Sequence, residues 1–141
     1  MDRNATAVWQ GGLRHGKGTI STESKALDSA PYSFGTRFEG VAGTNPEELL
    51  GAAHAGCFSM ALSLQLGEAG ITPERIETKA TVTLEKLETG FTITKVHLDV
   101  GVKAPGADRA KFEDAAQKAK TGCPLSKVLK AAISMDARLD A

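Results

Sequence analysis

Two cysteines, Cys57 and Cys123, are the side chains of this sequence best suited to covalent chemistry. Cys123 precedes Pro124 at a predicted helix start, where backbone N–H groups and the helix dipole favour a thiolate. Cys57 lies among small residues, Ala53, Ala55 and Gly56, which leave room for another group to approach its sulfur. Unpaired cysteines often simply pack in a core, so two structural thiols are the alternative interpretation. These residues alone leave open which thiol would attack, although the helix dipole favours Cys123.

Charged residues that could tune a thiol occur close to Cys57 in the sequence. Glu48 stands three residues after Asn45 and can close a capping box with it, which leaves Glu47 without an evident structural role. Arg37 is a second candidate, because a guanidinium keeps its charge and offers several donors. These two charges add weight to a reactive thiol at Cys57.

A metal site is a less favoured interpretation of the same region. His54 and Cys57 are three residues apart on one helical face and could supply two ligands. A tetrahedral site would also need Cys123 and either His15 or His97, without any paired C-x-x-C or H-x-x-x-H spacing. We therefore interpret His54 as a hydrogen-bonded core histidine or a pocket wall. A serine hydrolase is also disfavoured, since the nucleophile-elbow motif is absent.

A long apolar helix over residues 44–66 is predicted to carry Cys57. Asn45 can cap it, Pro46 suits its first turn, and acidic residues follow where the helix dipole favours negative charge. Residues 49–67 contain no charged side chain, and their apolar residues occupy several faces. A helix that is apolar all round must be buried all round.

The remaining pattern predicts strands on both sides of this helix, followed by two shorter helices. Apolar alternation shifts phase near Thr94 and Lys95, which indicates a β-bulge. The order of elements predicts an α+β fold with mainly antiparallel sheets around the long buried central helix. The predicted strands cover residues 5–10, 19–22, 33–41, 78–87, 91–103 and 133–139. The predicted helices cover residues 108–120 and 123–130, and the first of them has an apolar stripe of Phe112, Ala115, Ala116 and Ala119.

Length and composition indicate how many domains the protein has and which kinds of partner it can bind. The 141 residues predict a single domain over 1–141, and 17 basic against 17 acidic residues give no reason to expect a nucleic-acid partner or an anionic membrane. The uncharged helix contains several polar side chains and is flanked by acidic residues, so we do not expect it to span a membrane. The polar N-terminus lacks a signal-peptide pattern, and we expect a cytoplasmic protein.

Three stretches of the sequence resemble a known family. They are N-P-E-E-L-L-G-A-A-H-A-G-C-F-S-M-A-L-S-L (45–64), T-G-C-P-L-S-K-V-L-K (121–130) and T-R-F-E-G (36–40). Together they resemble the osmotically inducible protein C (OsmC) family, whose sister group is the organic hydroperoxide resistance (Ohr) proteins. The A-A-H-A-G-C-F motif is similar to that of the OsmC branch rather than to that of the Ohr proteins. The resemblance implies a thiol-dependent peroxidase and antioxidant protein on an intertwined α+β homodimer, with no metal or organic cofactor.

The resemblance also implies roles for individual residues. Cys57 would be the peroxidatic cysteine, Cys123 the resolving cysteine and Glu47 the catalytic carboxylate. Arg37 is our choice for the active-site arginine, with Arg14 the alternative, because the sister group places its arginine in the N-terminal hairpin. Cys57 would be oxidised to a sulfenic acid and condense with Cys123 to a disulfide, which a small dithiol or lipoyl-type reductant would reopen.

Helix geometry adds an expectation about assembly. Glu47 and Cys57 are ten residues apart, or about 15 Å along a straight helix, so they cannot touch within one chain. Two antiparallel helices crossing near Ala52 would bring Glu47 of one protomer beside Cys57 of the other. We therefore expect a homodimer whose two sites each use both chains.

The substrate expectation is an organic hydroperoxide, with hydrogen peroxide reduced less well. Apolar candidates for the pocket wall are Phe34, Phe38, Phe58 and Leu50, and burying an alkyl tail against them contributes ~25 cal/mol per Å². Trp9 is expected to be a packing residue. Two rival functions remain, a non-enzymatic thiol redox sensor and a small-molecule binding dimer.

Overall fold

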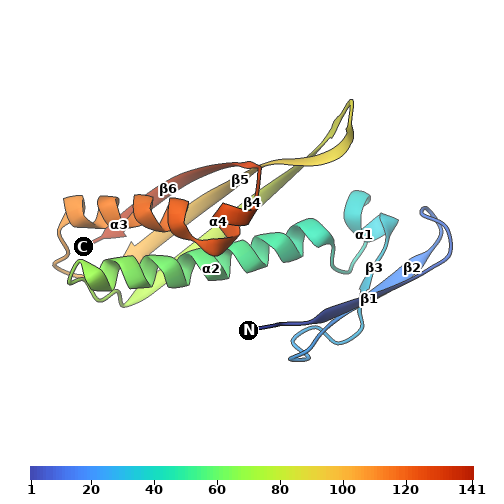
Figure 1. Cartoon of the computed structure of the whole chain (residues 1–141), viewed down its shortest axis with the longest axis horizontal. Helices are drawn as coiled ribbons and strands as arrows, with labels where there is room; N and C mark the ends of the chain where they lie inside the picture. The colour runs from blue at the N-terminus through green and yellow to red at the C-terminus, as the bar shows by residue number, and fades with distance from the viewer. The chain divides into compact units, whose positions relative to one another are not determined.

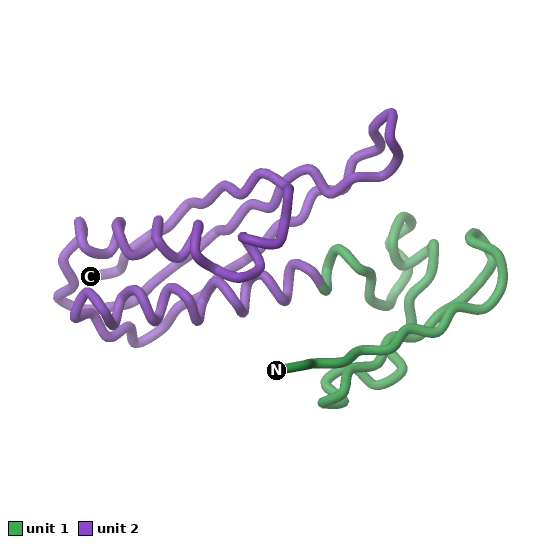
Figure 2. Tube along the Cα trace, in the orientation of Figure 1, with its two compact units in different colours: residues 1–49 green, residues 50–141 purple.

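A computed structural model describes the whole chain, residues 1–141, which divides into two compact units, residues 1–49 and residues 50–141 (Figure 2). The expectation of a single domain stays a prediction. Helix α2 begins in the first unit and continues through the second. The elements in chain order are β1 (Ala5–Gln10), β2 (Lys17–Thr22), β3 (Ala30–Tyr32), α1 (Phe34–Phe38), α2 (Pro46–Glu68), β4 (Arg75–Leu87), β5 (Gly90–Lys103), α3 (Arg109–Gly122), α4 (Pro124–Val128) and β6 (Ala132–Asp140) (Figure 1).

The first unit is a small antiparallel sheet in the order β1-β2-β3, followed by α1. The sheet needs a glycine at its centre. A Cβ on Gly18 would lie 2.5 Å from the Tyr32 ring and 2.8 Å from the Trp9 ring. Without that Cβ the two rings come within 5.4 Å of each other, centroid to centroid, over the backbone. The sheet thus presents an aromatic pair on one face.

The strand predicted over residues 33–41 is wrong, because helix α1 occupies this stretch and the strand lies earlier, at β3. Ser33 and Thr36 form a capping box. The Ser33 hydroxyl accepts a hydrogen bond from the Thr36 backbone N–H, and the Thr36 hydroxyl accepts one from the Ser33 backbone N–H. This reciprocal cap satisfies two donors that a helix start leaves unpaired. Phe34 and Phe38, four residues apart, are therefore neighbours on one face of α1, with ring centroids 4.8 Å apart.

Helix α2 begins as the sequence predicts. The Asn45 side chain accepts a hydrogen bond of 2.8 Å from the backbone N–H of Glu48, which is the expected cap. The second half of the predicted capping box is different, because the Glu48 carboxylate accepts from the Thr44 hydroxyl at 2.9 Å. Glu48 thus serves the start of the helix, and Glu47 is left for another partner.

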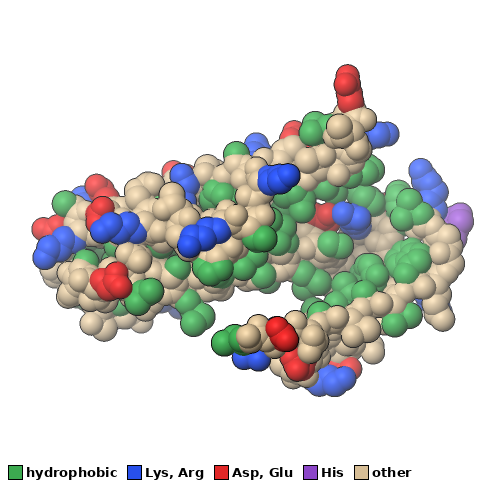
Figure 3. All heavy atoms as spheres, in the orientation of Figure 1, with side chains coloured by type: hydrophobic (Ala, Val, Ile, Leu, Met, Phe, Trp, Pro, Cys, Tyr) green, Lys and Arg blue, Asp and Glu red, His purple; other side chains and the backbone are tan.

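In the single chain α2 buries one face, formed by Gly51, His54, Phe58, Leu62 and Leu66. Met60 and Leu64 are 78% and 60% exposed, so burial of α2 on all sides is not a property of the isolated chain. Hydrophobic side chains reach the surface in both units (Figure 3). By length and composition alone α2 could cross a membrane, but a core helix meets the same criteria, which makes this weak evidence.

The second unit is a three-stranded sheet, β4-β5-β6, with α2 and α3 side by side on one face (Figure 1). Strands β4 and β5 form a long antiparallel hairpin. Its register shifts where Thr83 pairs with Lys95 and Leu84 pairs with Ile93, which confirms the predicted bulge at Thr94. Strand β6 is parallel to β5, so the expectation of antiparallel strands fails there. The crossover from β5 to β6 runs through α3 and α4, as a parallel pair requires.

The core of this unit lies between the sheet and the two helices. Alternate residues of β5 point into it, and α3 contributes the four apolar residues predicted as its stripe, all buried. Cys123 is part of this core, and Cys57 packs against it. The principal members are Phe58, Leu62, Leu66, Val96, Leu98, Val100, Val102, Phe112, Ala115, Ala116, Ala119 and Cys123.

Candidate active site

The two thiols lie together in the second unit. The Cys123 thiol donates to the sulfur of Cys57 across 3.2 Å, although the residues are 66 positions apart. Both cysteines are free; Cys57 is half-buried and Cys123 is fully buried. Solvent therefore reaches the pair from the Cys57 side. A sulfur pair at this separation can close to a disulfide of about 2.05 Å by a small movement of either side chain.

Three elements hold the pair in place. Cys57 lies in the middle of α2, and Cys123 ends α3 and precedes Pro124, the first residue of α4. The backbone N–H of Cys123 donates to the carbonyl of Ala119 at 2.9 Å, which fixes it to the last turn of α3. Cys123 thus occupies the corner between two helices, with its side chain turned into the core.

The surroundings of Cys57 favour its neutral form within this unit. Burial raises the pKa of the Cys57 thiol, and the hydrogen bond from Cys123 raises it further. A backbone hydrogen bond from Leu125, in α4, acts in the opposite direction and lowers this pKa. The net shift is upward, so the second unit alone does not supply a charge that would activate the Cys57 thiolate.

His54 lies one helical turn before Cys57 and is fully buried. Its Nε2 shares a hydrogen bond of 2.9 Å with the hydroxyl of Ser126, and its Nδ1 has no partner. Burial lowers the pKa of His54, so the ring is neutral near pH 7. The interpretation of His54 as a hydrogen-bonded core histidine is confirmed. No group of three or more His, Cys, Asp or Glu side chains is placed to hold a metal ion.

Arg37 and Glu47 form an ion pair within the first unit. The Nε of Arg37 lies 3.1 Å from both carboxylate oxygens of Glu47, and one terminal nitrogen also donates to Oε1. The Glu47 side chain is only 12% exposed, whereas that of Arg37 is 36% exposed. A carboxylate held against a guanidinium in this way fixes the orientation of the guanidinium. Glu47, which had no role in capping, therefore has Arg37 as its partner.

A cavity of about 280 Å³ adjoins Arg37 within the first unit. Phe34 and Phe38 line it as predicted, and the guanidinium of Arg37 lies 5.3 Å from the centre of the Phe38 ring. The sequence did not point to the other main lining residues, Trp9 and Tyr32. They reach the cavity through the pairing of β1, β2 and β3, which no local pattern specifies.

Two residues proposed around the site have other positions. Phe58 has no exposed surface and belongs to the core, so it cannot form the wall of an open pocket as predicted. Arg14, the alternative arginine, lies in the exposed turn between β1 and β2, and its guanidinium stacks 5.0 Å above the Phe34 ring. Arg14 and Arg37 thus both lie near the α1 aromatic pair, and Arg37 is the one that Glu47 orients.

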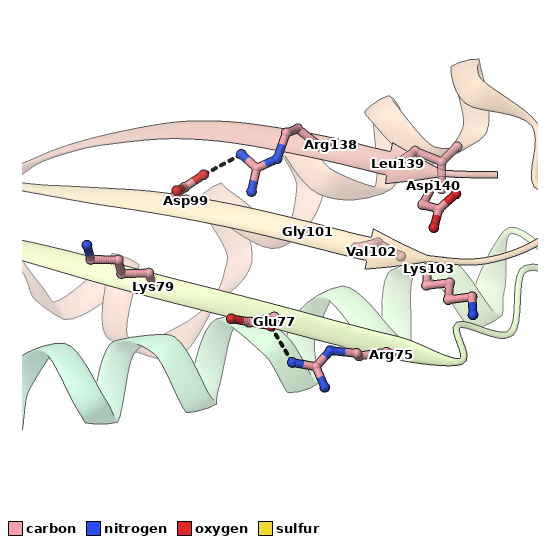
Figure 4. A pocket seen from close by; sticks show the side chains of 10 residues that line it. All are labelled: Arg75, Glu77, Lys79, Asp99, Gly101, Val102, Lys103, Arg138, Leu139 and Asp140. Carbon is pink, nitrogen blue, oxygen red and sulfur yellow. Dashed lines mark hydrogen bonds and ion pairs between the residues drawn. The ribbon is translucent and has the colours of Figure 1, made fainter.

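A second cavity, of about 520 Å³, lies on the open face of the β4-β5-β6 sheet and contains neither thiol (Figure 4). Its lining is largely charged. Arg138 points to Asp99, and Arg75 points to Glu77, as ion pairs on the surface. Gly101, between these pairs, has no side chain to fill the groove. Since both of its arginines are paired with carboxylates in exposed ion pairs, we interpret this groove as a solvated sheet face rather than a reaction site.

The chain is similar to characterised bacterial proteins over nearly its full length. It is 58% identical over 139 residues to "Peroxiredoxin OsmC" of Escherichia coli (strain K12), which covers 99% of this chain and 97% of that protein. The protein of the same name from Shigella flexneri matches to the same extent.

Solved structures agree with this likeness. The organic hydroperoxide resistance protein OhrB of Bacillus subtilis has a TM-score of 0.69 and 28% identity, over 97% of this chain and 98% of that one. An organic hydroperoxide resistance protein from Elizabethkingia anophelis has a TM-score of 0.70 and 25% identity, over 96% of this chain and 94% of that one. The model of the family of OsmC-like proteins matches residues 38–138. The chain therefore belongs to the OsmC-like protein family.

Proposed function

We propose that this protein is a cysteine-based peroxidase that reduces organic hydroperoxides to alcohols, and hydrogen peroxide less well. The observation that carries the proposal is the pair of free thiols, 3.2 Å apart, of which one is half-buried and the other fully buried. The relatives named peroxiredoxin and organic hydroperoxide resistance protein support a peroxide-related redox function.

In this mechanism the Cys57 thiolate attacks one peroxide oxygen, the O–O bond breaks, and the alkoxide leaves as an alcohol after taking up a proton. Cys57 is then a sulfenic acid. The Cys123 thiol attacks its sulfur, a disulfide forms and water leaves. A dithiol of the dithiothreitol or lipoyl type reduces the disulfide and completes the cycle. No metal or organic cofactor takes part.

The proposal assigns the attack to Cys57, although the helix dipole alone favours Cys123. Cys57 is the sulfur that solvent can reach, whereas Cys123 has no exposed surface. Helix α4, which follows Cys123, has only five residues, so its dipole is small. Exposure therefore outweighs the dipole in choosing the nucleophile.

The proposal also requires a cation at Cys57, because burial raises the pKa of this thiol within its own unit. We assign that role to Arg37, oriented by Glu47. Glu47 and Cys57 are ten residues apart on α2, so the Arg37–Glu47 pair of a second protomer is the natural source of the charge. A guanidinium beside the sulfur favours the thiolate and donates to the peroxide oxygens.

The proposed homodimer also accounts for the exposed face of α2. Met60 and Leu64 are large apolar side chains without cover in the single chain, and Gly56 has nothing within 4 Å of the position of a Cβ. Two antiparallel copies of α2 can approach closely at such small residues. The pairing would bury this face in both protomers. We propose a soluble, cytoplasmic dimer of this kind.

The cavity beside Arg37 supports an organic substrate. It is lined by aromatic side chains, and its one charged lining residue is the arginine that the proposal places at the peroxide. An alkyl or aryl tail buried there gains the transfer free energy of its apolar area, ~25 cal/mol per Å². Hydrogen peroxide has no tail and gains nothing from this cavity.

The decisive test is peroxide consumption with excess dithiothreitol or dihydrolipoamide, in wild type, Cys57→Ser and Cys123→Ser. We expect many turnovers for wild type and none for Cys57→Ser. Without reductant, Cys123→Ser should consume one equivalent of peroxide to form the Cys57 sulfenic acid and a second equivalent to form the sulfinic acid. Wild-type turnover limited to one equivalent would indicate a redox sensor. Tight hydroperoxide binding without consumption, unchanged in Cys57→Ser, would indicate a binding module.

A further inference from the structure

His54 and Ser126 form a second connection between the two segments that carry the thiols. His54 precedes Cys57 by three residues in α2, and Ser126 follows Cys123 by three residues in α4. The two segments therefore meet at the sulfurs and meet again about one helical turn away along each segment. One contact joins the sulfurs at 3.2 Å, and the other joins His54 Nε2 to Ser126 Oγ at 2.9 Å.

Helix α4 has few other contacts: Leu125 packs against the core as a partly buried side chain, and its backbone hydrogen-bonds to the Cys57 thiol. The helix contains five residues and none of them is buried, and Cys123 provides no side-chain cap for it. A segment with few buried contacts opens more readily than the core around it. His54, by contrast, has no exposed surface and lies on the buried face of α2. The hydrogen bond from so fixed a ring is therefore one of the few contacts that position α4.

The ring is arranged to make this one bond. Its Nδ1 is buried and has no partner, so Ser126 is the only group that satisfies the imidazole. With no acceptor at Nδ1, the tautomer with the proton on Nε2, donating to the Ser126 hydroxyl, leaves no buried donor unpaired. Loss of this bond would leave both ring nitrogens buried without partners, which is costly.

We propose that His54 is a positioning residue that holds α4 in place through Ser126, and so keeps Cys123 within reach of Cys57 for disulfide formation. This rests on the proposed function, and it adds a role outside the reacting groups. When Cys57 is a sulfenic acid, Cys123 must reach its sulfur before a second peroxide does. The chemistry is unchanged: Cys57–SOH and Cys123–SH give the disulfide and water. The His54–Ser126 bond affects only how often the two sulfurs meet.

The first measurement does not need peroxidase activity. Each protein is equilibrated with mixtures of reduced and oxidised dithiothreitol, and the fraction of Cys57–Cys123 disulfide gives the effective concentration of one thiol at the other. We expect Ser126→Ala and His54→Leu each to lower this effective concentration about three- to tenfold, the range for one lost hydrogen bond. The double variant should lose no more than either single variant, since the two residues act through one bond.

A matched control comes from the same helix. The Ser59 hydroxyl shares a hydrogen bond of 2.8 Å with the Thr78 hydroxyl, joining α2 to β4 instead of α4. Ser59→Ala therefore removes a comparable bond, and it should leave the thiol–disulfide equilibrium unchanged. His54→Gln, whose amide can reach the Ser126 hydroxyl, should recover at least part of the loss seen in His54→Leu. If His54→Leu does not fold, Ser126→Ala and Ser59→Ala still make the comparison.

The second measurement uses excess peroxide and the intact mass of the protein. In Ser126→Ala slower condensation should increase the fraction of Cys57 that gains two oxygens, while the rate of the first oxidation stays that of wild type. An unchanged effective concentration in both Ser126→Ala and His54→Leu would overturn the proposal. An equal fall in Ser59→Ala would overturn it too, because the effect would then be a general loss of stability. If wild type forms this disulfide in dithiothreitol buffers but consumes no peroxide, the proposed function fails and the equilibrium still tests the role of His54.

Discussion

The Arg37 guanidinium holds the Glu47 carboxylate by its Nε, which lies 3.1 Å from each oxygen, and by a terminal nitrogen. These residues are ten positions apart and belong to different helices, α1 and α2. The contact gives Glu47 the partner that helix capping does not provide, and so separates its role from that of the adjacent Glu48. Glu48 serves the start of α2 through Thr44, and Glu47 orients the arginine.

Glu47→Gln tests this separation, with Glu48→Gln as its matched control. Gln keeps the shape of Glu47 but removes the charge that orients Arg37, so we expect the catalytic efficiency with cumene hydroperoxide to fall at least about tenfold, the scale of one charge-assisted hydrogen bond. Glu48→Gln should leave this efficiency near that of wild type and lower only the stability, by about 1 kcal/mol or less. Equal losses of activity in both variants would contradict the assignment.

Arg37→Met is expected to make Cys57 a weaker acid. Burial raises the pKa of this thiol, and in the proposed dimer the guanidinium opposes that shift. Without Arg37, burial acts alone, and the pH midpoint for alkylation of Cys57 by iodoacetamide should move upward from the wild-type value. The measurement uses the Cys123→Ser background, so that Cys57 is the only thiol that can be alkylated. An unchanged midpoint would remove Arg37 from the site, and the same experiment with Arg14→Met would then test the alternative.

The raised pKa of Cys57 also determines how the stability of the protein changes with pH. In a folded state where burial dominates, Cys57 keeps its proton to a higher pH than in the unfolded chain. Its contribution to stability is therefore present below the unfolded pKa and is lost as the pH rises through the folded pKa. In the Arg37→Met, Cys123→Ser protein, urea unfolding should show stability declining on the alkaline side. Replacing Cys57 by Ser in that background should weaken the decline.

Met60→Glu tests the pairing of two protomers through α2. Met60 is 78% exposed on the face of α2 that the sheet does not cover. A charge buried there in a dimer would be costly, so sedimentation velocity should show monomers and peroxide turnover should fall. Gln117→Glu adds the same charge at an exposed position of α3 and should leave a dimer. A Met60→Glu protein that is monomeric and fully active would exclude a site shared between chains.

Phe38→Leu should change the preference among peroxides. Phe38 lines the cavity beside Arg37, and a smaller side chain offers less apolar area to a substrate tail. We expect the rate with cumene hydroperoxide, relative to that with hydrogen peroxide, to fall about three- to tenfold. Phe91→Leu, in the β4–β5 hairpin, provides the matched control and should leave the ratio unchanged. If both ratios stay at the wild-type value, the cavity does not select the substrate.

Local signals in the sequence predicted the elements that depend on neighbouring residues. The cap at Asn45, the buried stripe of α3 and the bulge at Thr94 all depend on residues within one turn or one strand pair. The stretch after Tyr32 was misassigned because alternating Phe and Thr also fit a strand, and the Ser33–Thr36 capping box decided in favour of a helix.

Long-range relationships were harder to predict. Side chains alternate in the same way in parallel and antiparallel strands, so the sequence of β6 alone does not predict its parallel pairing with β5. The meeting of Cys57 with Cys123 came from family resemblance, because no local pattern joins residues 66 apart. The bond between His54 and Ser126 follows from that meeting, since each lies one turn from a thiol.

Cys57 and Cys123 bracket β4, β5 and α3, which make up most of the second unit. A bond between the sulfurs would turn this stretch into a covalent ring, and the chain-entropy model assigns about 4 kcal/mol of added stability to a ring of that size. Oxidation by a peroxide would thus raise the stability of the folded chain until the disulfide is reduced. The form waiting to be reduced would resist heat and proteases better than the form ready to react.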